Sequence, residues 1–237
     1  MPSLFFVDEI STQGIQSIEN EEAHHAIKVL RLSIGELVYV SDGQGKWISG
    51  PITEISKKSL SIRVENTGEI HAEKPELVLV QAFTKSDRNK EMLELVTASG
   101  ADRIIPWSSQ RSISKWQSDS REKWMSTVKE ACKQSKRFRI PLVDYQMTTS
   151  EILNEIKTGF AIVFHESATE KFSEISLPVN LDRIYLIVGP EGGITEEELE
   201  LFLSTNATVV RLGIPILRSA HAGFAAMSAI QTKIGRW

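Results

Sequence analysis

The chain has 237 residues, of which 41% are hydrophobic and 24% charged, as in a globular protein with one large domain or two modest ones. The single cysteine, Cys132, excludes an internal disulfide, and the scattered histidines lack the spacing of metal ligands, so we expect no metal site. The formal net charge of -4 argues against a chain that is basic enough to bind nucleic acid over its whole surface.

Residues 1–70 are predicted to form a small β-barrel. Asn20 is placed to cap a helix over 21–32, whose apolar residues share one face. The residues Asp42-Gly43-Gln44-Gly45 predict a turn. Strand patterns lie around this turn, at 36–40, 47–48, 52–55 and 60–64. Short strands at this spacing are typical of a small barrel, and the polar stretch 66–75 predicts a linker.

From residue 76 the pattern changes to strands that alternate with helices. The run Leu77-Val78-Leu79-Val80 is apolar throughout, as in a strand that is covered on both faces. Further strands are expected at 103–106, 160–164, 184–188 and 209–212, and helices at 90–100, 121–136, 195–203 and 220–234. This order predicts an α/β domain with a mostly parallel sheet over residues 76–237.

Charge is unevenly distributed along the chain. Residues 76–141 carry 13 basic and 8 acidic side chains, whereas 1–75 carry 7 and 11, and 142–237 carry 7 and 12. A basic middle between acidic flanks can form a patch for phosphate groups. The alternative is a solvated helix face, which the charge pattern alone favours.

The first candidate ligand-binding segment directly follows a predicted buried strand. Its sequence is Gly189-Pro190-Glu191-Gly192-Gly193. Its glycines allow a ligand to approach the backbone, and Thr195 with Glu198 forms the pattern of a capping box. The spacing is neither that of a dinucleotide fingerprint nor that of a P-loop. The acidic side chains would repel a pyrophosphate and suit a ligand with positive charge, such as S-adenosylmethionine. A tight strand–helix turn without a ligand is the alternative.

The second segment runs from Leu212-Gly213 to Arg218, where Gly213 and Pro215 end a strand and a helix of small residues follows. Arg218 stands directly before that helix. It is a candidate for ligand binding, and a salt bridge to one of the many carboxylates is the alternative. His221 is interpreted as a structural residue near the helix start, and Cys132 as a small core residue.

These motifs resemble those of the SPOUT methyltransferases, and within them the RsmE family of 16S rRNA uridine N3-methyltransferases. The similarity rests on GPEGG-I-T-x-x-E at 189–198 and on L-G-x-x-I-L-R at 212–218. Other matching residues extend it over almost the whole chain: His24, Lys28 to Arg31, Lys85, Asp87, Arg88, Ile105-Pro106, Arg111-Ser112, Glu130-Ala131, Gln134-Ser135, Arg137, Ile140-Pro141 and His165-Glu166. The chain departs from the family at Thr97-Ala98-Ser99-Gly100 and at Ser219-Ala220-His221-Ala222, where a Thr-Glu-Thr-Ala stretch is usual.

The resemblance implies a PUA-like RNA-binding barrel over 1–70 and a SPOUT domain over 76–237, with a deep trefoil knot at about 160–237 that binds S-adenosylmethionine. It implies a homodimer that modifies 16S rRNA in the assembled small ribosomal subunit. The residues expected to bind the cofactor are Phe164, His165, Glu166, Gly189, Glu191, Gly192, Leu212, Gly213, Ile216, Leu217 and Arg218.

The resemblance also suggests roles in catalysis and in RNA binding. Arg218 is expected to stabilise the uracil anion, and Glu191 to orient the ligand or, less favoured, to assist deprotonation. The residues expected to contact RNA are Arg31, Lys85, Arg88, Arg111, Lys133, Arg137 and Arg139.

Two other functions stay open from the sequence. One is a SPOUT enzyme with another RNA target, and the other is a non-catalytic rRNA-binding assembly factor, which the altered stretch Ser219-Ala220-His221-Ala222 would suit. The N-terminus lacks the basic and apolar regions of a signal peptide. No apolar run reaches the ~18 residues of a membrane-spanning helix. We therefore expect a cytoplasmic protein without a membrane partner.

Overall fold

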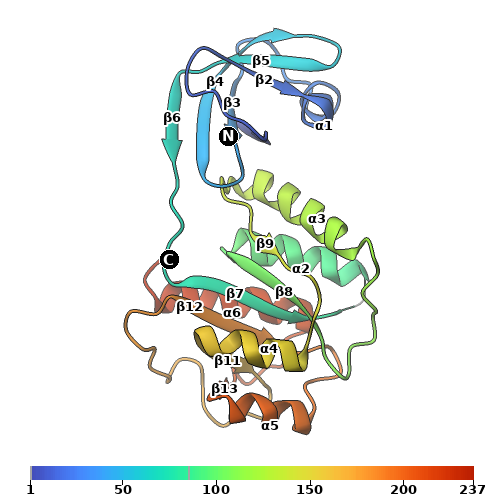
Figure 1. Cartoon of the computed structure of the whole chain (residues 1–237), viewed down its shortest axis with the longest axis vertical. Helices are drawn as coiled ribbons and strands as arrows, with labels where there is room; N and C mark the ends of the chain where they lie inside the picture. The colour runs from blue at the N-terminus through green and yellow to red at the C-terminus, as the bar shows by residue number, and fades with distance from the viewer. Residues whose placement is uncertain (1, 85) are drawn as a thin grey trace. The chain divides into compact units, whose positions relative to one another are not determined.

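The computed structural model describes residues 2–84 and 86–237 (Figure 1). The chain divides into two compact units, which are described separately. The first contains the residues up to Ala72 together with Cys132–Ile140, and the second contains Glu73–Ala131 and Pro141–Trp237. Within the described residues, none of the helices has the length and apolar character needed to span a lipid bilayer.

The first unit contains a six-stranded sheet around one apolar core. Its strands are β1 (Ser3–Phe6), β2 (Ile15–Glu19), β3 (Leu37–Ser41), β4 (Lys46–Ile55), β5 (Ser59–Arg63) and β6 (Asn66–Glu69). The order is β1-β3-β4-β5-β2, with β6 beside β4. Alternate residues such as Val38, Val40 and Ile48 point into the core and are fully buried. This period of two is why the short alternating segments fold as strands.

Two sequence predictions fail in this unit. Asn20 does not cap the helix, because Glu19 occupies the cap position. The Glu19 side chain makes no capping hydrogen bond to the helix, and Asn20 has φ 56, a left-handed conformation that Asn tolerates. The helix is short, α1 (Asn20–His24), and continues as a π-helical turn over His25–Val29. The predicted linker contains β6, which pairs with Lys46–Ser49 of β4. Backbone pairing does not require apolar side chains, so the polar pattern concealed this strand.

Cys132–Ile140 packs against the β3–β4 hairpin within the same unit. The Phe138 ring stacks on Trp47 with centroids 5.4 Å apart, and its carbonyl accepts a hydrogen bond of 2.8 Å from Ser41 Oγ. Lys133 forms a buried ion pair of 2.9 Å with Glu22. Cys132 is fully buried, as predicted, and burial raises the pKa of its thiol to about 12.

The second unit contains a seven-stranded sheet whose neighbouring strands are all parallel, as the sequence predicts. The strands are β7 (Glu76–Ala82), β8 (Arg103–Ser108), β9 (Leu142–Val143), β10 (Met147–Thr148), β11 (Phe160–Phe164), β12 (Arg183–Val188) and β13 (Thr208–Val210). The order is β10-β8-β7-β12-β11-β13, with β9 beside β8. The helices of the chain beyond residue 85 are α2 (Ser86–Ala98), α3 (Ser120–Ser135), α4 (Thr149–Glu155), α5 (Glu196–Ser204) and α6 (Ser219–Lys233).

Helices cover both faces of this sheet, which is why its strands are apolar throughout. One core contains the β7 residues Val78, Val80 and Ala82 together with Ile152 of α4 and Phe202 of α5. The alternate residues of β7 face the other way, and α6 packs on that side between the sheet and α2. In Figure 1, α4 lies in front of the strands and α6 behind them.

The order of the strands reverses between β7 and β12. The chain leaves β7 through α2 and enters β8 on one side, whereas it leaves β12 through α5 and enters β13 on the other side. The segments that follow β7 and β12 therefore lead away to opposite sides of the sheet, and they leave a crevice at the carboxyl ends of these two strands. In open α/β sheets this switch point is where ligands bind.

Candidate active site

The turn after β12 is shaped by its glycines. A Cβ on Gly189 would lie 2.6 Å from Ile194 Cγ1, so a larger residue would collide there. Gly193 has φ 76, a conformation that favours glycine, and its N–H donates to the Pro190 carbonyl over 3.0 Å. The predicted capping box is present, since Thr195 Oγ1 accepts from the Glu198 N–H and the Glu198 carboxylate accepts from the Thr195 N–H. The turn is therefore held rigidly at the end of the strand.

The second glycine-containing segment, from Leu212 to Arg218, leads from β13 into α6. Arg218 occupies the N-cap position of α6 with extended backbone angles, and its carbonyl accepts from the N–H groups of His221 and Ala222. Ser219 Oγ donates to the Gly189 carbonyl over 2.6 Å. The two segments, remote in sequence, are therefore joined by a direct hydrogen bond.

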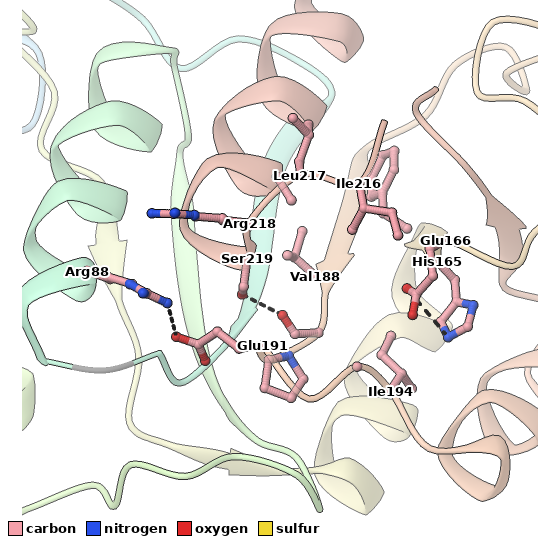
Figure 2. Close-up of a pocket in the computed structure, with 15 residues that line it drawn as sticks. Arg88, His165, Glu166, Val188, Glu191, Ile194, Ile216, Leu217, Arg218 and Ser219 are labelled. Carbon is pink, nitrogen blue, oxygen red and sulfur yellow. Dashed lines mark hydrogen bonds and ion pairs between the residues drawn. The ribbon is translucent and has the colours of Figure 1, made fainter. Parts of the chain in front are cut away.

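Both segments line one cavity of about 340 Å³ at the carboxyl ends of the strands (Figure 2). Its walls come from the ends of β11 and β12, from α2, and from the start of α6. The lining residues are Arg88, Phe164, His165, Glu166, Val188, Gly189, Pro190, Glu191, Gly193, Ile194, Ile216, Leu217, Arg218, Ser219 and Ala222. A smaller cavity of about 90 Å³ adjoins it, shares Phe164, His165 and Glu166, and is lined by the residues 211–217.

Most of the predicted cofactor residues lie together here. Eight line the larger cavity: Phe164, His165, Glu166, Gly189, Glu191, Ile216, Leu217 and Arg218. Leu212 and Gly213 line the smaller one. Gly192 lines neither, and its carbonyl instead accepts a 3.0 Å hydrogen bond from Arg111.

Other lining residues were not anticipated from the sequence. Val188 and Ile194 flank the glycine turn and could have been inferred from that position. Ser219 stood out only as a departure from the family. Arg88 was assigned to RNA, but it lines the cavity and pairs with Glu191 over 3.3 Å. This contact could not be predicted from the sequence, because Arg88 lies far from both glycine segments in the chain.

The charges around the cavity are mixed. The carboxylates of Glu166 and Glu191 line it, and Arg88 holds Glu191 in place. Among the described residues, the guanidinium of Arg218 has no hydrogen-bond or ion-pair partner, and its side chain is exposed. In Figure 2 it points away from His165 and Glu166, toward the side of the cavity that carries Arg88. A cationic group is therefore available beside the cavity.

The size and the lining residues of this cavity fit S-adenosylmethionine. The volume of the larger cavity lies at the lower end of the ~300–1,000 Å³ range of ligand pockets. Val188, Ile194 and Leu217 supply apolar surface for an adenine ring, and the carboxylates suit a sulfonium and an ammonium group. Within the described residues, no backbone N–H or carbonyl of residues 213–217 has a partner. These groups are free to bind a ligand.

The predicted RNA-binding residues are dispersed. Arg31 is exposed on the first unit, and Arg137 is partly buried there. Lys133 is buried and its ammonium forms an ion pair with Glu22 within the first unit. Arg139 donates to the carbonyls of Gln44 and Ile70. Arg111 is exposed on the second unit, and Lys85 lies outside the described residues.

Comparison with known proteins identifies the family. An RNA methyltransferase domain matches residues 72–231, and an RNA methyltransferase PUA domain matches residues 18–65. The protein named ribosomal RNA small subunit methyltransferase E of Mycobacterium bovis is 32% identical, over 99% of this chain and 93% of its own length. The Bacillus subtilis protein of the same name is 29% identical, over 96% of both chains.

Solved structures agree with these sequence matches. The ribosomal RNA small subunit methyltransferase E from Neisseria gonorrhoeae, solved with S-adenosyl methionine bound, superposes with a TM-score of 0.88 at 26% identity and 98% coverage of both chains. A predicted RNA methyltransferase from Thermotoga maritima gives a TM-score of 0.75 at 25% identity and 100% coverage. With its N-terminal PUA domain and its parallel-sheet domain, the chain belongs to the ribosomal RNA small subunit methyltransferase E (RsmE) family of SPOUT-type RNA methyltransferases.

Proposed function

We propose that this protein transfers a methyl group from S-adenosylmethionine to N3 of a uridine in the 16S RNA of the small ribosomal subunit. One observation carries the proposal: the two glycine-containing segments meet at the strand switch point and line one cavity with a suitable donor set. The names of the relatives and the bound cofactor of the Neisseria gonorrhoeae protein support the same reaction.

The cofactor would be held mainly by backbone groups and apolar side chains. The Gly189 turn and the residues 212–217 offer N–H and carbonyl groups at the cavity, and Leu217 and Ile194 offer apolar surface. Glu166 and Glu191 would face its positive charges. When bound, S-adenosylmethionine supplies an electrophilic methyl group on a sulfonium.

The uridine must lose the proton on N3, which passes to water, before that nitrogen is an effective nucleophile. As the N3–carbon bond forms, the carbon–sulfur bond breaks and the sulfur keeps the electron pair. Arg218, which lines the cavity, would stabilise the negative charge spread over O2, N3 and O4 of the deprotonated base. Glu191, held by Arg88, would orient the ligands in the cavity rather than carry the proton. Alignment of the three reacting atoms supplies much of the rate enhancement.

The rest of the molecule would serve RNA binding and assembly. We assign RNA contacts in the assembled subunit to the PUA-like unit (residues 1–70) and to Arg31, Arg111 and Arg137. We also propose a trefoil knot at about 160–237 within the domain 76–237, a cytoplasmic location, and a homodimer. Exposed apolar side chains beside the cavity support the dimer: Ile214 (90%), Ile216 (79%), Leu217 (43%) and Phe224 (36%).

A labelling experiment tests the proposal. The purified protein is incubated with S-adenosylmethionine carrying a labelled methyl group and with small ribosomal subunits from a strain that lacks this gene. The label is expected on N3 of one uridine of the 16S RNA, and not in subunits from the parent strain. Parallel incubations replace the small subunits by large subunits or tRNA, and a label there would indicate a different target. Calorimetry measures cofactor binding, and the absence of both label and binding would indicate a non-catalytic assembly factor.

A further inference from the structure

The hydroxyl of Ser219 lies at the junction of three elements. It is the first residue of α6, it directly follows Arg218, and it is only 7% exposed. Its Oγ lies 2.6 Å from the Gly189 carbonyl at the end of β12 and 3.0 Å from Gln81 Nε2 on β7. A single hydroxyl therefore connects the two central strands of the sheet to the helix that carries Arg218.

The direction of both hydrogen bonds is fixed by chemistry. A carbonyl can only accept, so the Ser219 hydroxyl donates to Gly189. The Gln81 amide nitrogen can only donate, so Ser219 accepts from it. The bonds therefore run in one sequence, from the Gln81 N–H to the Ser219 hydroxyl to the Gly189 carbonyl. Hydrogen bonds in such a chain polarise and strengthen one another.

Gln81 is an unusual residue for its location. It is fully buried in β7, after a run of apolar residues, and its Oε1 has no hydrogen-bond partner within the described residues. A Cβ on Gly223 of α6 would lie 3.0 Å from this oxygen, so the glycine leaves room for the amide. A buried amide with an unpaired oxygen destabilises the fold. This cost is explained if the amide orients Ser219.

We propose that Gln81 and Ser219 form a positioning relay that sets the separation between the Gly189 turn and the start of α6, and with it the width of the cofactor cavity. This inference rests on the proposed function, since it names residues that tune the same cavity. Ser219 lines the cavity and Gln81 does not. Besides Ser219 Oγ, the Gln81 Nε2 donates to the Ala82 carbonyl of its own strand over 3.1 Å, so its link to the cavity runs through Ser219. Neither residue transfers a proton or contacts the reacting atoms.

The first test is the Ser219→Ala variant. Its dissociation constant for S-adenosylhomocysteine, the demethylated product, is measured by calorimetry and is expected to rise about tenfold, because the hydrogen bond to Gly189 is lost. The KM for the cofactor should rise in parallel while kcat at saturation stays within about threefold. Ser219→Thr keeps the hydroxyl and should bind as the wild type does. Unchanged affinity in Ser219→Ala would overturn the proposal.

The second test separates positioning from simple stability. Gln81→Met keeps the shape but removes the amide, and it should weaken binding about three- to tenfold. Gln231→Met is the matched control, since Gln231 is also buried with an unpaired Oε1 but donates to the Ser99 carbonyl, away from the cavity. It should change thermal stability without changing affinity. Equal losses of affinity in the two variants would contradict the relay.

A second control comes from α6 itself, and a double variant tests whether Gln81 and Ser219 act together. Among the described residues, the Ser228 hydroxyl of α6 bonds within its own helix, to the Phe224 carbonyl, so Ser228→Ala should bind normally. The double variant Ser219→Ala/Gln81→Met should bind no more weakly than Ser219→Ala, because both changes interrupt one chain of hydrogen bonds. If the wild type itself does not bind the ligand, the proposed function fails. If the wild type binds and the variants bind equally well, only the relay fails.

Discussion

Arg218 combines exposure with proximity to the cavity. Its backbone is fixed at the N-cap of α6 by the hydrogen bonds of its carbonyl, while its guanidinium has no partner among the described residues. Because no carboxylate of the described residues pairs with it, the Arg218 guanidinium is available to a substrate anion. Glu191 differs, because its carboxylate forms an ion pair with Arg88.

Arg218→Ala is therefore expected to lower kcat by about 10²-fold, the usual effect of removing one preorganised group that stabilises developing charge. The affinity for S-adenosylhomocysteine should change little, because the guanidinium points away from His165 and Glu166, toward the side of the cavity that carries Arg88. Methylation of small subunits at saturating cofactor is the measurement. A near-normal rate would remove Arg218 from the chemistry.

Cys132 gives a prediction for alkaline pH. Its thiol has a pKa raised by burial from the ordinary 9.0 to about 12, so the folded protein keeps the proton where the unfolded chain loses it. This contribution to stability is fully present below pH 9.0 and is lost as the pH rises toward 12. Above pH 9.0 the wild type should lose on the order of 1 kcal/mol per pH unit more than Cys132→Ser. Urea unfolding at several alkaline pH values checks this, and parallel pH curves would contradict it.

At the scale of elements, two capping boxes of the same type differ in burial. Thr148–Glu151 begins α4 on the surface, whereas Glu198 at the start of α5 is fully buried. Besides Thr195, the Glu198 carboxylate accepts from the Gln110 N–H over 2.9 Å and from the Thr149 hydroxyl over 3.0 Å. It thus joins α5, α4 and the loop after β8, whose Arg111 holds Gly192.

Glu198→Ala should lower the free energy of unfolding by about 2–4 kcal/mol, because it leaves several donors unpaired in the interior. Glu151→Ala removes the same capping interaction from an exposed site and is the control, with a distinctly smaller effect. Urea denaturation of both variants measures the difference. Equal losses would show that the Glu198 contacts to Gln110 and Thr149 contribute nothing.

The elements differ in how well the sequence predicted them. β7, β11 and β12 were predictable because strands buried on both faces are apolar throughout. β6, β9 and β10 were missed because polar or very short segments carry no periodic signal. No strand was predicted at β1 or β2 either, and no helix at α4. The glycine segments of the site were recognised from their spacing and their family pattern. The Gln81–Ser219 contact was not, because it depends on which face of β7 meets α6.

At the scale of the whole molecule, the two compact units do not follow the order of the chain. The expected domains, 1–70 and 76–237, are continuous, whereas Cys132–Ile140 belongs to the same unit as the N-terminal sheet. Phe138 packs against Tyr39 and Trp47, and Lys133 pairs with Glu22. Sequence periodicity describes local structure and cannot reveal that a late segment completes an early unit.

A fragment of residues 73–237 should therefore be less stable than its resemblance to a complete domain suggests. Removing the first 72 residues leaves Phe138 without its aromatic partners and leaves the Lys133 ammonium without Glu22. We expect a lower melting temperature and binding of a hydrophobic dye, and we expect a separately produced fragment 1–72 to reverse both. A fragment 73–237 that melts as the full chain does would contradict this.

The first unit is built from two segments that are far apart in the chain, and this affects how it folds during synthesis on the ribosome. The N-terminal strands emerge early, but the segment that closes their core, Cys132–Ile140, follows only after Glu73–Ala131 has been translated. Translation adds ~5–20 residues per second, so Trp47 of the nascent sheet stays uncovered for several seconds. During that interval the growing polypeptide is an expected client of chaperones that bind exposed aromatic surface, although the finished protein is not.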